Sequence, residues 1–116
     1  MADIQILIDE YGIIKEAEKI LPTEFKLNFL TALAELEDRD CYKHQAFPKT
    51  KLHIVKGQKL STAKIYRAYI DKISGWRIHL QCSTEQNNTI ILKQIIPGQK
   101  HDDCLDIIKS QRHRYQ

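Results

Sequence analysis

The residues best suited to chemistry in this sequence are cationic side chains and histidines between positions 64 and 101. Arg67 stands in one strand-like segment, Arg77 and His79 alternate in the next, and Lys100 precedes His101 after the last one. Arginine and lysine bind phosphate groups, and histidine gains or loses a proton near neutral pH. The pattern predicts contacts to phosphates, with His79 as a proton donor or an RNA contact. The alternative is a sheet face whose arginines form salt bridges and whose histidine is an ordinary strand residue.

Charge is divided unevenly along the chain. Residues 1–42 contain four Lys/Arg and ten Asp/Glu, a balance of −6, whereas residues 43–116 contain fourteen and five, a balance of +9. All five histidines also lie in the second part. So basic a segment in a small protein is typical of a surface that meets nucleic acid. A solvated basic face that touches nothing is the alternative interpretation.

The composition argues against several other classes of protein. With 116 residues, 42% of them apolar, the chain has the size of one folded domain over residues 1–116. Apolar runs are short and the first residues do not resemble a secretory signal, so we expect no membrane contact. Three cysteines at wide spacing argue against a disulfide framework and favour a reducing cytoplasm.

Neither a metal nor a cofactor is expected. The sequence has no CxxC pair, no HExxH spacing and no glycine-rich phosphate loop. Metal-ligand residue types gather near its end, without the spacing of a metal site, at His101, Asp102, Asp103, Cys104 and His113. Cys82 and Cys104 are expected to be structural.

Two consecutive amphipathic helices are predicted in the acidic part. Ile4–Ile8 is a short apolar-rich run that fits an edge strand or an extension of the first helix. From Ile13 to Leu21 the apolar residues have the spacing of one helix face. Pro22 interrupts that pattern, and Thr23 is the expected N-cap of a second helix. Together the two helices form a hairpin.

The basic part predicts a sheet followed by a short helix. Strands are expected at 52–55, 65–70, 76–82 and 89–96, with turns at 71–75 and 85–88 and a helix at 101–115. Alternation buries Trp76, Ile78 and Leu80 against Phe25, Phe29 and Leu33. The other face is then left to display Arg77, His79 and Gln81. The fold class is α+β, a helical hairpin packed on a curved three- to four-stranded antiparallel sheet with a short C-terminal helix.

This order of elements resembles the RelE/ParE toxin superfamily of bacterial toxin–antitoxin systems, including its HigB-like branch. Members have a β-α-α-β-β-β-α order and a RelE-like fold. The motifs that carry the resemblance are Lys64-Ile65-Tyr66-Arg67, Gly75-Trp76-Arg77-Ile78 and Ile90-Ile91-Leu92-Lys93, followed by Gln99-Lys100-His101. They are short, and they cover most of the chain in order.

The resemblance implies a cytoplasmic toxin that cleaves messenger RNA on the ribosome and is silenced by an antitoxin protein. Homo-oligomers are compatible with it. The 2′-hydroxyl of the RNA attacks the neighbouring phosphate, which requires a proton acceptor, a cation and an acid for the leaving oxygen. The catalytic residues that it implies are Arg67, Arg77, Lys100, His101 and Tyr115. The RNA-binding residues that it implies are Lys64, Tyr66, His79, Lys93, Arg112 and Arg114.

Two features depart from the family's pattern. The segment from Lys43 to Lys59 is longer than the usual connection, and Asp102 and Asp103 follow directly on the basic pair at 100–101. These carboxylates would suit the N-terminus of a helix better than a phosphate site. A non-catalytic RNA- or DNA-binding module and a protein-interaction domain are the alternative functions. ParE-like members, which act on DNA gyrase, are compatible with the same fold.

Overall fold

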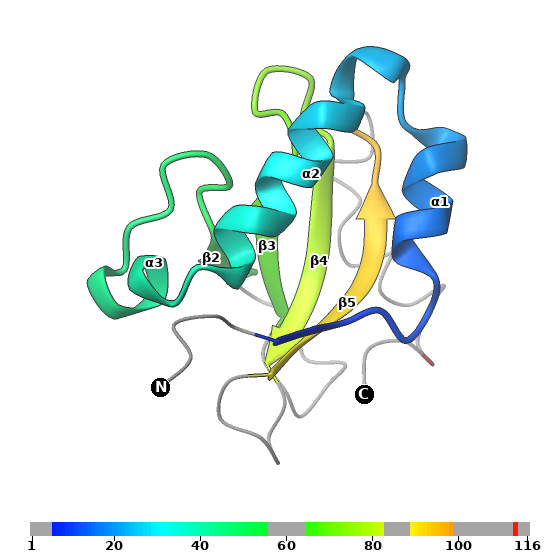
Figure 1. The fold of residues 1–116 in the computed structure, drawn as a ribbon. Helices are drawn as coiled ribbons and strands as arrows, with labels where there is room; N and C mark the ends of the chain where they lie inside the picture. The colour runs from blue at the N-terminus through cyan, green and yellow to red at the C-terminus, as the bar shows by residue number, and fades with distance from the viewer. Residues whose placement is uncertain (1–5, 56–64, 83–88, 99–112, 114–116) are drawn as a thin grey trace.

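Three helices and a five-stranded sheet form the part of the chain that the computed structural model describes, which is residues 6–55, 65–82, 89–98 and 113. In chain order the elements are β1 (Ile6–Ile8), α1 (Ile13–Ile20), α2 (Thr23–Glu37), α3 (Arg39–His44), β2 (His53–Ile54), β3 (Ile65–Tyr69), β4 (Arg77–Cys82) and β5 (Thr89–Ile96). The fold is α+β, as the sequence predicts (Figure 1). None of the described helices is long and apolar enough to cross a membrane.

The strands form one mixed sheet with the order β1-β5-β4-β3-β2. Strands β2 to β5 pair antiparallel, whereas β1 runs parallel to β5, with Ile6 opposite Thr89. The prediction of a three- to four-stranded antiparallel sheet is therefore wrong in the number of strands and in the direction of β1. The added strand is explained by β5, in which apolar residues on both sides of Lys93 and Gln94 are typical of a strand inside a sheet. β1 pairs with the edge of β5 that a simple meander would leave open.

The first residues of both helices in the hairpin are set by the residues that precede them. The carboxylate of Asp9 caps α1, because it accepts hydrogen bonds from the main-chain N–H groups of Ile13 and Ile14. Pro22 then precedes α2, and Thr23 is the first helical residue without a side-chain capping bond. The expected N-cap role of Thr23 is therefore wrong. Proline at this place sets the entry of the chain without needing a hydrogen-bond donor.

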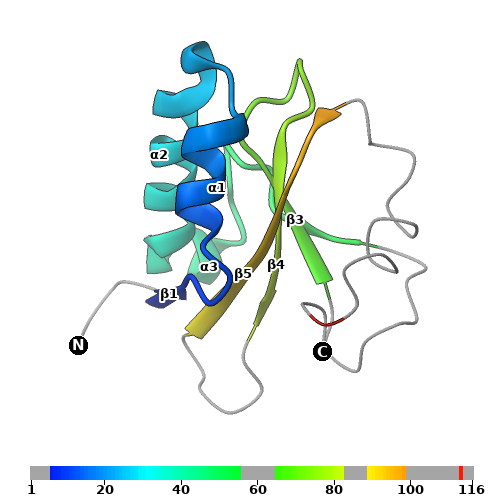
Figure 2. The same ribbon diagram turned by 90° about the vertical axis from the view of Figure 1, so that its right-hand side faces the viewer.

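The core lies between this hairpin and one face of the sheet. Viewed edge-on, α1 and α2 lie on the same side of β3, β4 and β5 (Figure 2). Phe29 and Leu33 of α2 belong to one buried cluster with Ile78 and Leu80 of β4, which confirms the predicted core face of that strand. Trp76, expected in the core, is only half-buried at the margin of the cluster.

A buried carboxylate ties the segment after α3 to α2. Glu35 accepts hydrogen bonds from the main-chain N–H groups of Lys49 (3.0 Å) and Thr50 (2.9 Å) and from the Thr50 hydroxyl (2.7 Å). Thr50 has no exposed surface, and its carbonyl oxygen accepts from the main-chain N–H of Tyr69 (2.7 Å). The long connection that departs from the family's pattern is thus anchored between helix and sheet.

Candidate nucleic-acid interface

A row of polar side chains crosses four strands of the sheet. The register pairs His53 of β2 with Arg67 of β3. Arg67 pairs in turn with His79 of β4, and His79 with Gln94 of β5. Paired residues point to the same side of a sheet. Because neighbouring strands lie about 4.8 Å apart, the two histidines flank the arginine at about 5 Å on either side.

The row lies on the face of the sheet that is opposite the helices. Ala68, Ile78 and Leu80, which alternate with the residues of the row, belong to the cluster under the helical hairpin. Alternation along a strand therefore places Arg67 and His79 on the other side. Arg77 lies on that side too, two residues before His79, and Gln81 two residues after it.

The part of this face on β4 is buried, contrary to the expectation that it displays its polar residues to solvent. Arg77 and His79 have no exposed surface, and Gln81 is 1% exposed. The assignment of these residues to one face is confirmed, but their exposure is wrong. Alternation separates the two faces of a strand and carries no information on whether either face is covered. A ligand can reach these side chains only when the face opens.

The turn between β3 and β4 holds Arg77 in place. Nη1 of Arg77 donates a hydrogen bond to the main-chain oxygen of Gly75 (3.0 Å). Gly75 has φ +84, a backbone conformation that glycine adopts without strain. Its Cα packs against Gly98, and a Cβ on Gly98 would collide with the main-chain oxygen of Ser74. The two glycines therefore allow the turn and the end of β5 to touch, which fixes the start of β4. The predicted turn at 71–75 is confirmed by the bond from the N–H of Gly75 to the carbonyl oxygen of Asp71 (2.9 Å).

His79 is neutral at physiological pH. Burial lowers its pKa to about 3, and the positive charges of Arg67 and Arg77 add to the shift. A neutral imidazole accepts a proton or a hydrogen bond. This environment keeps the imidazole unprotonated and also makes it a weak base, so either proton-transfer role requires its pKa to rise when substrate binds.

Lys93 lies apart from this row, at a bulge in β5. His79 pairs with Gln94 while Leu80 pairs with Leu92, so Lys93 is the extra residue. Its Nζ lies 5.3 Å from the centre of the Tyr11 ring, within range of a cation–π interaction. Burial lowers the pKa of Lys93, and Glu10 opposes that shift. The structure therefore places this predicted RNA contact against the loop between β1 and α1.

Tyr66 is also placed away from the row. It pairs with Leu80 and packs, half-buried, against the core under the helices. Alternation from Arg67 therefore turns its ring to the helix side, so it does not join the arginines as a stacking platform.

Several predicted site residues lie outside the described part of the chain. They are Lys64, Lys100, His101, Arg112, Arg114 and Tyr115, together with the predicted turn at 85–88 and, apart from His113, the predicted helix at 101–115. Within the described residues, no group of three or more histidine, cysteine or acidic side chains could hold a metal ion.

Two members of the row were missed in the sequence. His53 stands in the predicted strand at 52–55 between Leu52 and Ile54, and this alternation was the available signal. Its Nδ1 lies 2.8 Å from the carbonyl oxygen of Lys51, and its ring centre 5.9 Å from that of Tyr69. Gln94 gave no such signal, because the bulge in β5 shifts the alternation that would have aligned it.

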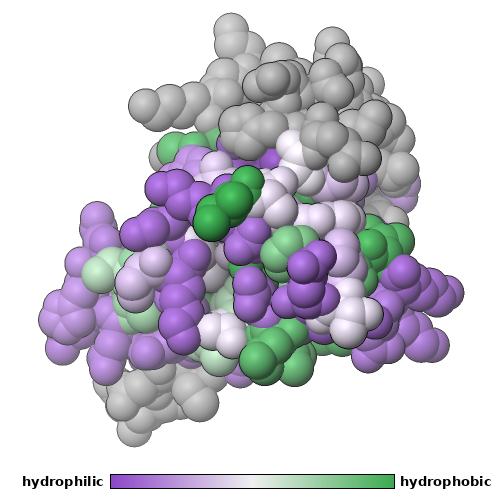
Figure 3. Space-filling model, turned by 90° about the horizontal axis from the view of Figure 1, so that it is seen from above, coloured by the Kyte–Doolittle hydropathy of each residue, from purple (hydrophilic) through white to green (hydrophobic). Residues whose placement is uncertain are grey.

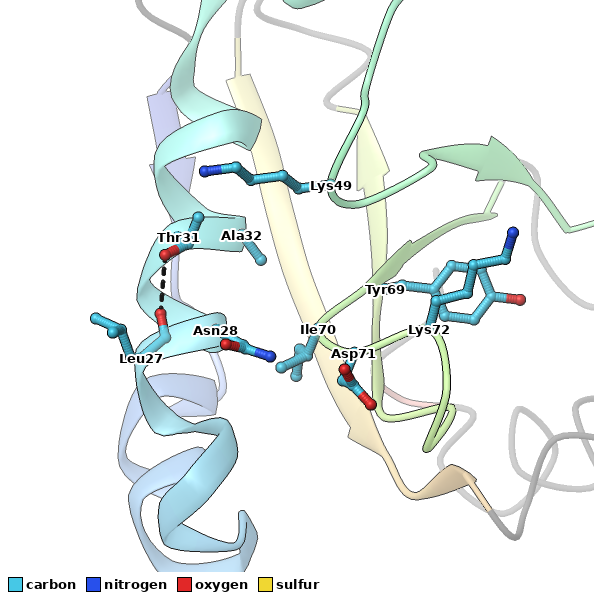
Figure 4. A pocket seen from close by; sticks show the side chains of 9 residues that line it. All are labelled: Leu27, Asn28, Thr31, Ala32, Lys49, Tyr69, Ile70, Asp71 and Lys72. Atoms are coloured by element: carbon cyan, nitrogen blue, oxygen red, sulfur yellow. Dashed lines mark hydrogen bonds between the residues drawn. The ribbon is translucent and has the colours of Figure 1, made fainter.

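A hollow of about 390 Å³ lies between α2 and the turn after β3 (Figure 4). Two of its polar side chains are hydrogen-bonded within their own elements. The Thr31 hydroxyl donates to the carbonyl oxygen of Leu27 (3.0 Å), and the Asp71 carboxylate accepts from the N–H of Ser74 (2.8 Å). Asn28 and Lys49 reach it from opposite walls.

The sheet face thus combines two permanent cations with a neutral imidazole among them and a second imidazole at its edge. Guanidinium groups bind phosphate oxygens, and imidazoles transfer protons, so the arrangement suits a phosphodiester. Comparison with protein-family models, curated proteins and solved structures finds no match to this chain.

Proposed function

We propose that this protein is a RelE-like toxin that cleaves messenger RNA at the ribosome and is silenced by an antitoxin. The observation that carries the proposal is the row in which Arg67 lies between His53 and His79 on three neighbouring strands. A ribonuclease that uses the RNA 2′-hydroxyl needs a base, a cation and an acid around one phosphate. The row contains one residue suited to each role.

The chemistry assigns one proton transfer to each histidine. Neutral His79 takes the proton of the 2′-hydroxyl as the 2′-oxygen forms its bond to phosphorus. Arg67 and Arg77 stabilise the charge that develops on the phosphorane oxygens. As the bond between phosphorus and the 5′-oxygen breaks, His53 gives a proton to that oxygen. The products are a 2′,3′-cyclic phosphate and a 5′-hydroxyl.

The electrostatic setting supports this division of roles. Burial beside two arginines keeps His79 unprotonated, and its pKa must rise on substrate binding before it becomes an effective base. His53 is exposed on an edge strand. Because a carbonyl oxygen only accepts, the contact of Nδ1 with Lys51 requires the hydrogen to be on Nδ1. Protonation at Nε2 then makes His53 an acid.

Burial adds one requirement to the proposal. Arg77 and His79 have no exposed surface, so RNA binding must open this face. A phosphate that enters also reverses part of the electrostatic penalty on His79, since its negative charge opposes the two guanidinium groups. Substrate binding would then strengthen the base when it is needed.

A cleavage assay tests this proposal. Purified protein is incubated with ribosomes engaged on a message, and the cut ends are analysed for the 2′,3′-cyclic phosphate. We expect Arg67→Gln to lower the cleavage rate by about 10²–10³-fold, the loss typical of one donor to a developing oxyanion. His79→Gln and His53→Gln should lose about 10²–10⁴-fold as a general base and a general acid. His44→Gln, an exposed histidine in α3, is the matched control and should cleave normally.

A sulfur leaving group separates the two histidines. At a mapped cleavage site, an RNA with sulfur in place of the bridging 5′-oxygen needs no acid, because a thiolate leaves unaided. This substrate should rescue His53→Gln and leave His79→Gln inactive. Retained RNA binding without any cleavage by the wild-type protein would instead favour the non-catalytic binding module. Absence of both binding and cleavage would favour the protein-interaction domain.

A further inference from the structure

Helix α2 has apolar residues on two opposite sides. Phe29, Leu33 and Leu36 face the core and are buried. Leu27 and Leu30 are 70% and 58% exposed. A surface helix normally has one apolar stripe and a polar outer face. α2 therefore has a second apolar surface, which the core does not use.

The exposed apolar residues of α2 lie on one line along the helix. Leu27, Leu30 and Ala34 are all exposed, at spacings of three and four residues. Thr23 before these residues and Glu37 after them continue the same line. The spacing along it alternates between four and three residues, as in the seam of a coiled coil. Figure 4 shows Leu27 pointing away from the hollow that Asn28 and Ala32 face. We name Leu27, Leu30 and Ala34 the outer seam.

A shallow groove lies beside the C-terminal half of α2, between this helix, α1 and β1. It has a volume of about 380 Å³ and is lined by Ile6, Ile14, Leu33 and Glu37, among others. Ile6 of β1 and Ile14 of α1 are themselves exposed. Seen from above, the molecule shows separate apolar patches within a largely hydrophilic face (Figure 3).

Charge around the end of the seam selects the kind of partner. Glu37, Asp38 and Asp40 are exposed there, with Arg39 as the only cation among them. The last turn of α2 has no basic residue, so the partial negative charge of the helix end adds to these carboxylates. A partner helix that lies along the seam binds more tightly if it places lysine or arginine beside these carboxylates.

A second copy of the chain fits this surface poorly. Two α2 helices laid in parallel would bring Glu37 and Asp38 against the same residues of the partner. Laid antiparallel, they would bring the acidic end of each against Glu24 and Lys26 of the other, whose charges cancel, so this pairing gains no charge complementarity. Like charges across such a seam oppose pairing. Charge complementarity thus favours a different protein.

We propose that the outer seam of α2 binds an amphipathic helix of another protein that carries basic residues beside its apolar positions. Apolar burial supplies the attraction, and the acidic end of α2 sets the direction in which the helix lies. This surface is on the opposite side of the molecule from the polar sheet face, so it does not depend on the proposed nuclease activity.

Two synthetic peptides test the proposal with the full chain. Both have leucine and alanine at the spacing of the seam, and one has lysine and the other glutamate at the flanking positions. We expect the lysine peptide to bind and to shift the NMR signals of Leu27, Leu30 and Ala34, and the glutamate peptide to bind at least tenfold more weakly. Leu30→Ser should weaken binding of the lysine peptide at least tenfold.

Ile73→Ser is the matched control. Ile73 is 99% exposed in the turn after β3, so this change removes an exposed apolar side chain that is not part of the seam. It should leave binding unchanged, and both serine variants should unfold at the same denaturant concentration as the wild type. Equal binding of the two peptides, or full binding by Leu30→Ser, would overturn the proposal. Dimerisation through α2 in sedimentation would overturn it in favour of a second copy.

Discussion

His79 lies on β4 with Arg67 beside it on β3 and Arg77 two residues away, and none of its surface is exposed. Each of these features lowers the pKa of the imidazole. The folded chain therefore holds this proton much less well than the unfolded chain does. At the scale of one residue, the same environment that keeps His79 neutral also makes folding sensitive to acid.

His79→Gln should reduce the loss of stability in acid. The unfolded pKa of 6.5 exceeds the folded value of about 3, so the unfolded chain binds a proton that the folded chain does not. Stability is then lost as the pH falls from about 6.5 towards about 3, by at most about 1.4 kcal/mol per pH unit. The measurement is urea unfolding at pH 7, 6, 5 and 4. His44→Gln should follow the wild-type curve, and a His79→Gln curve parallel to the wild type would contradict the assignment.

At the scale of elements, the packing of the long connection before β2 depends on one side chain of α2. Glu35 accepts three hydrogen bonds from Lys49 and Thr50 and is 8% exposed. Removing this carboxylate leaves buried N–H groups without their acceptor, and each such group costs about 1–3 kcal/mol. The connection should then detach from α2 more readily than in the wild-type protein.

Glu35→Ala should lower the free energy of unfolding by about 3 kcal/mol for this reason. The matched control is Glu37→Ala, two residues further along α2, where the carboxylate is exposed and the change should stay within about 0.5 kcal/mol. Equilibrium unfolding in urea measures both. Similar midpoints for the two variants would show that the bonds of Glu35 contribute little.

The helices and strands were easier to predict from the sequence than the way in which they pair and pack. Spacing of three and four residues revealed α1 and α2, and the alternation in β4 identified its core face correctly. The parallel pairing of β1 with β5 depends on residues more than 80 positions apart, and local patterns carry no record of it. Burial of Arg77 and His79 escaped prediction for a related reason, since a charged residue in an alternating strand normally faces water. The apolar residues on both sides of Lys93 and Gln94 in β5 were the one local sign that the sheet is covered on both faces.

For the whole molecule, the uneven charge of the sequence becomes a division between two surfaces. The helical hairpin belongs to the part with a balance of −6, and β2 to β5 belong to the part with a balance of +9. Figure 2 shows the hairpin on one side of the sheet, and Arg67, Arg77 and the two histidines of the row point to the other. We therefore expect RNA on one side of the sheet and a basic protein helix on the other.

The salt dependence of RNA binding tests the central claim about the sheet face most directly. Each phosphate contact with single-stranded RNA contributes about −0.7 to the slope of log affinity against log salt. We expect the wild-type protein to bind single-stranded RNA with a steep slope, and Arg67→Gln to bind more weakly with a slope shallower by about 0.7. Arg39→Gln, an exposed arginine of α3, should match the wild type. A slope unchanged by Arg67→Gln, or one reduced equally by Arg39→Gln, would contradict the claim that RNA phosphates bind at the row formed by His53, Arg67 and His79.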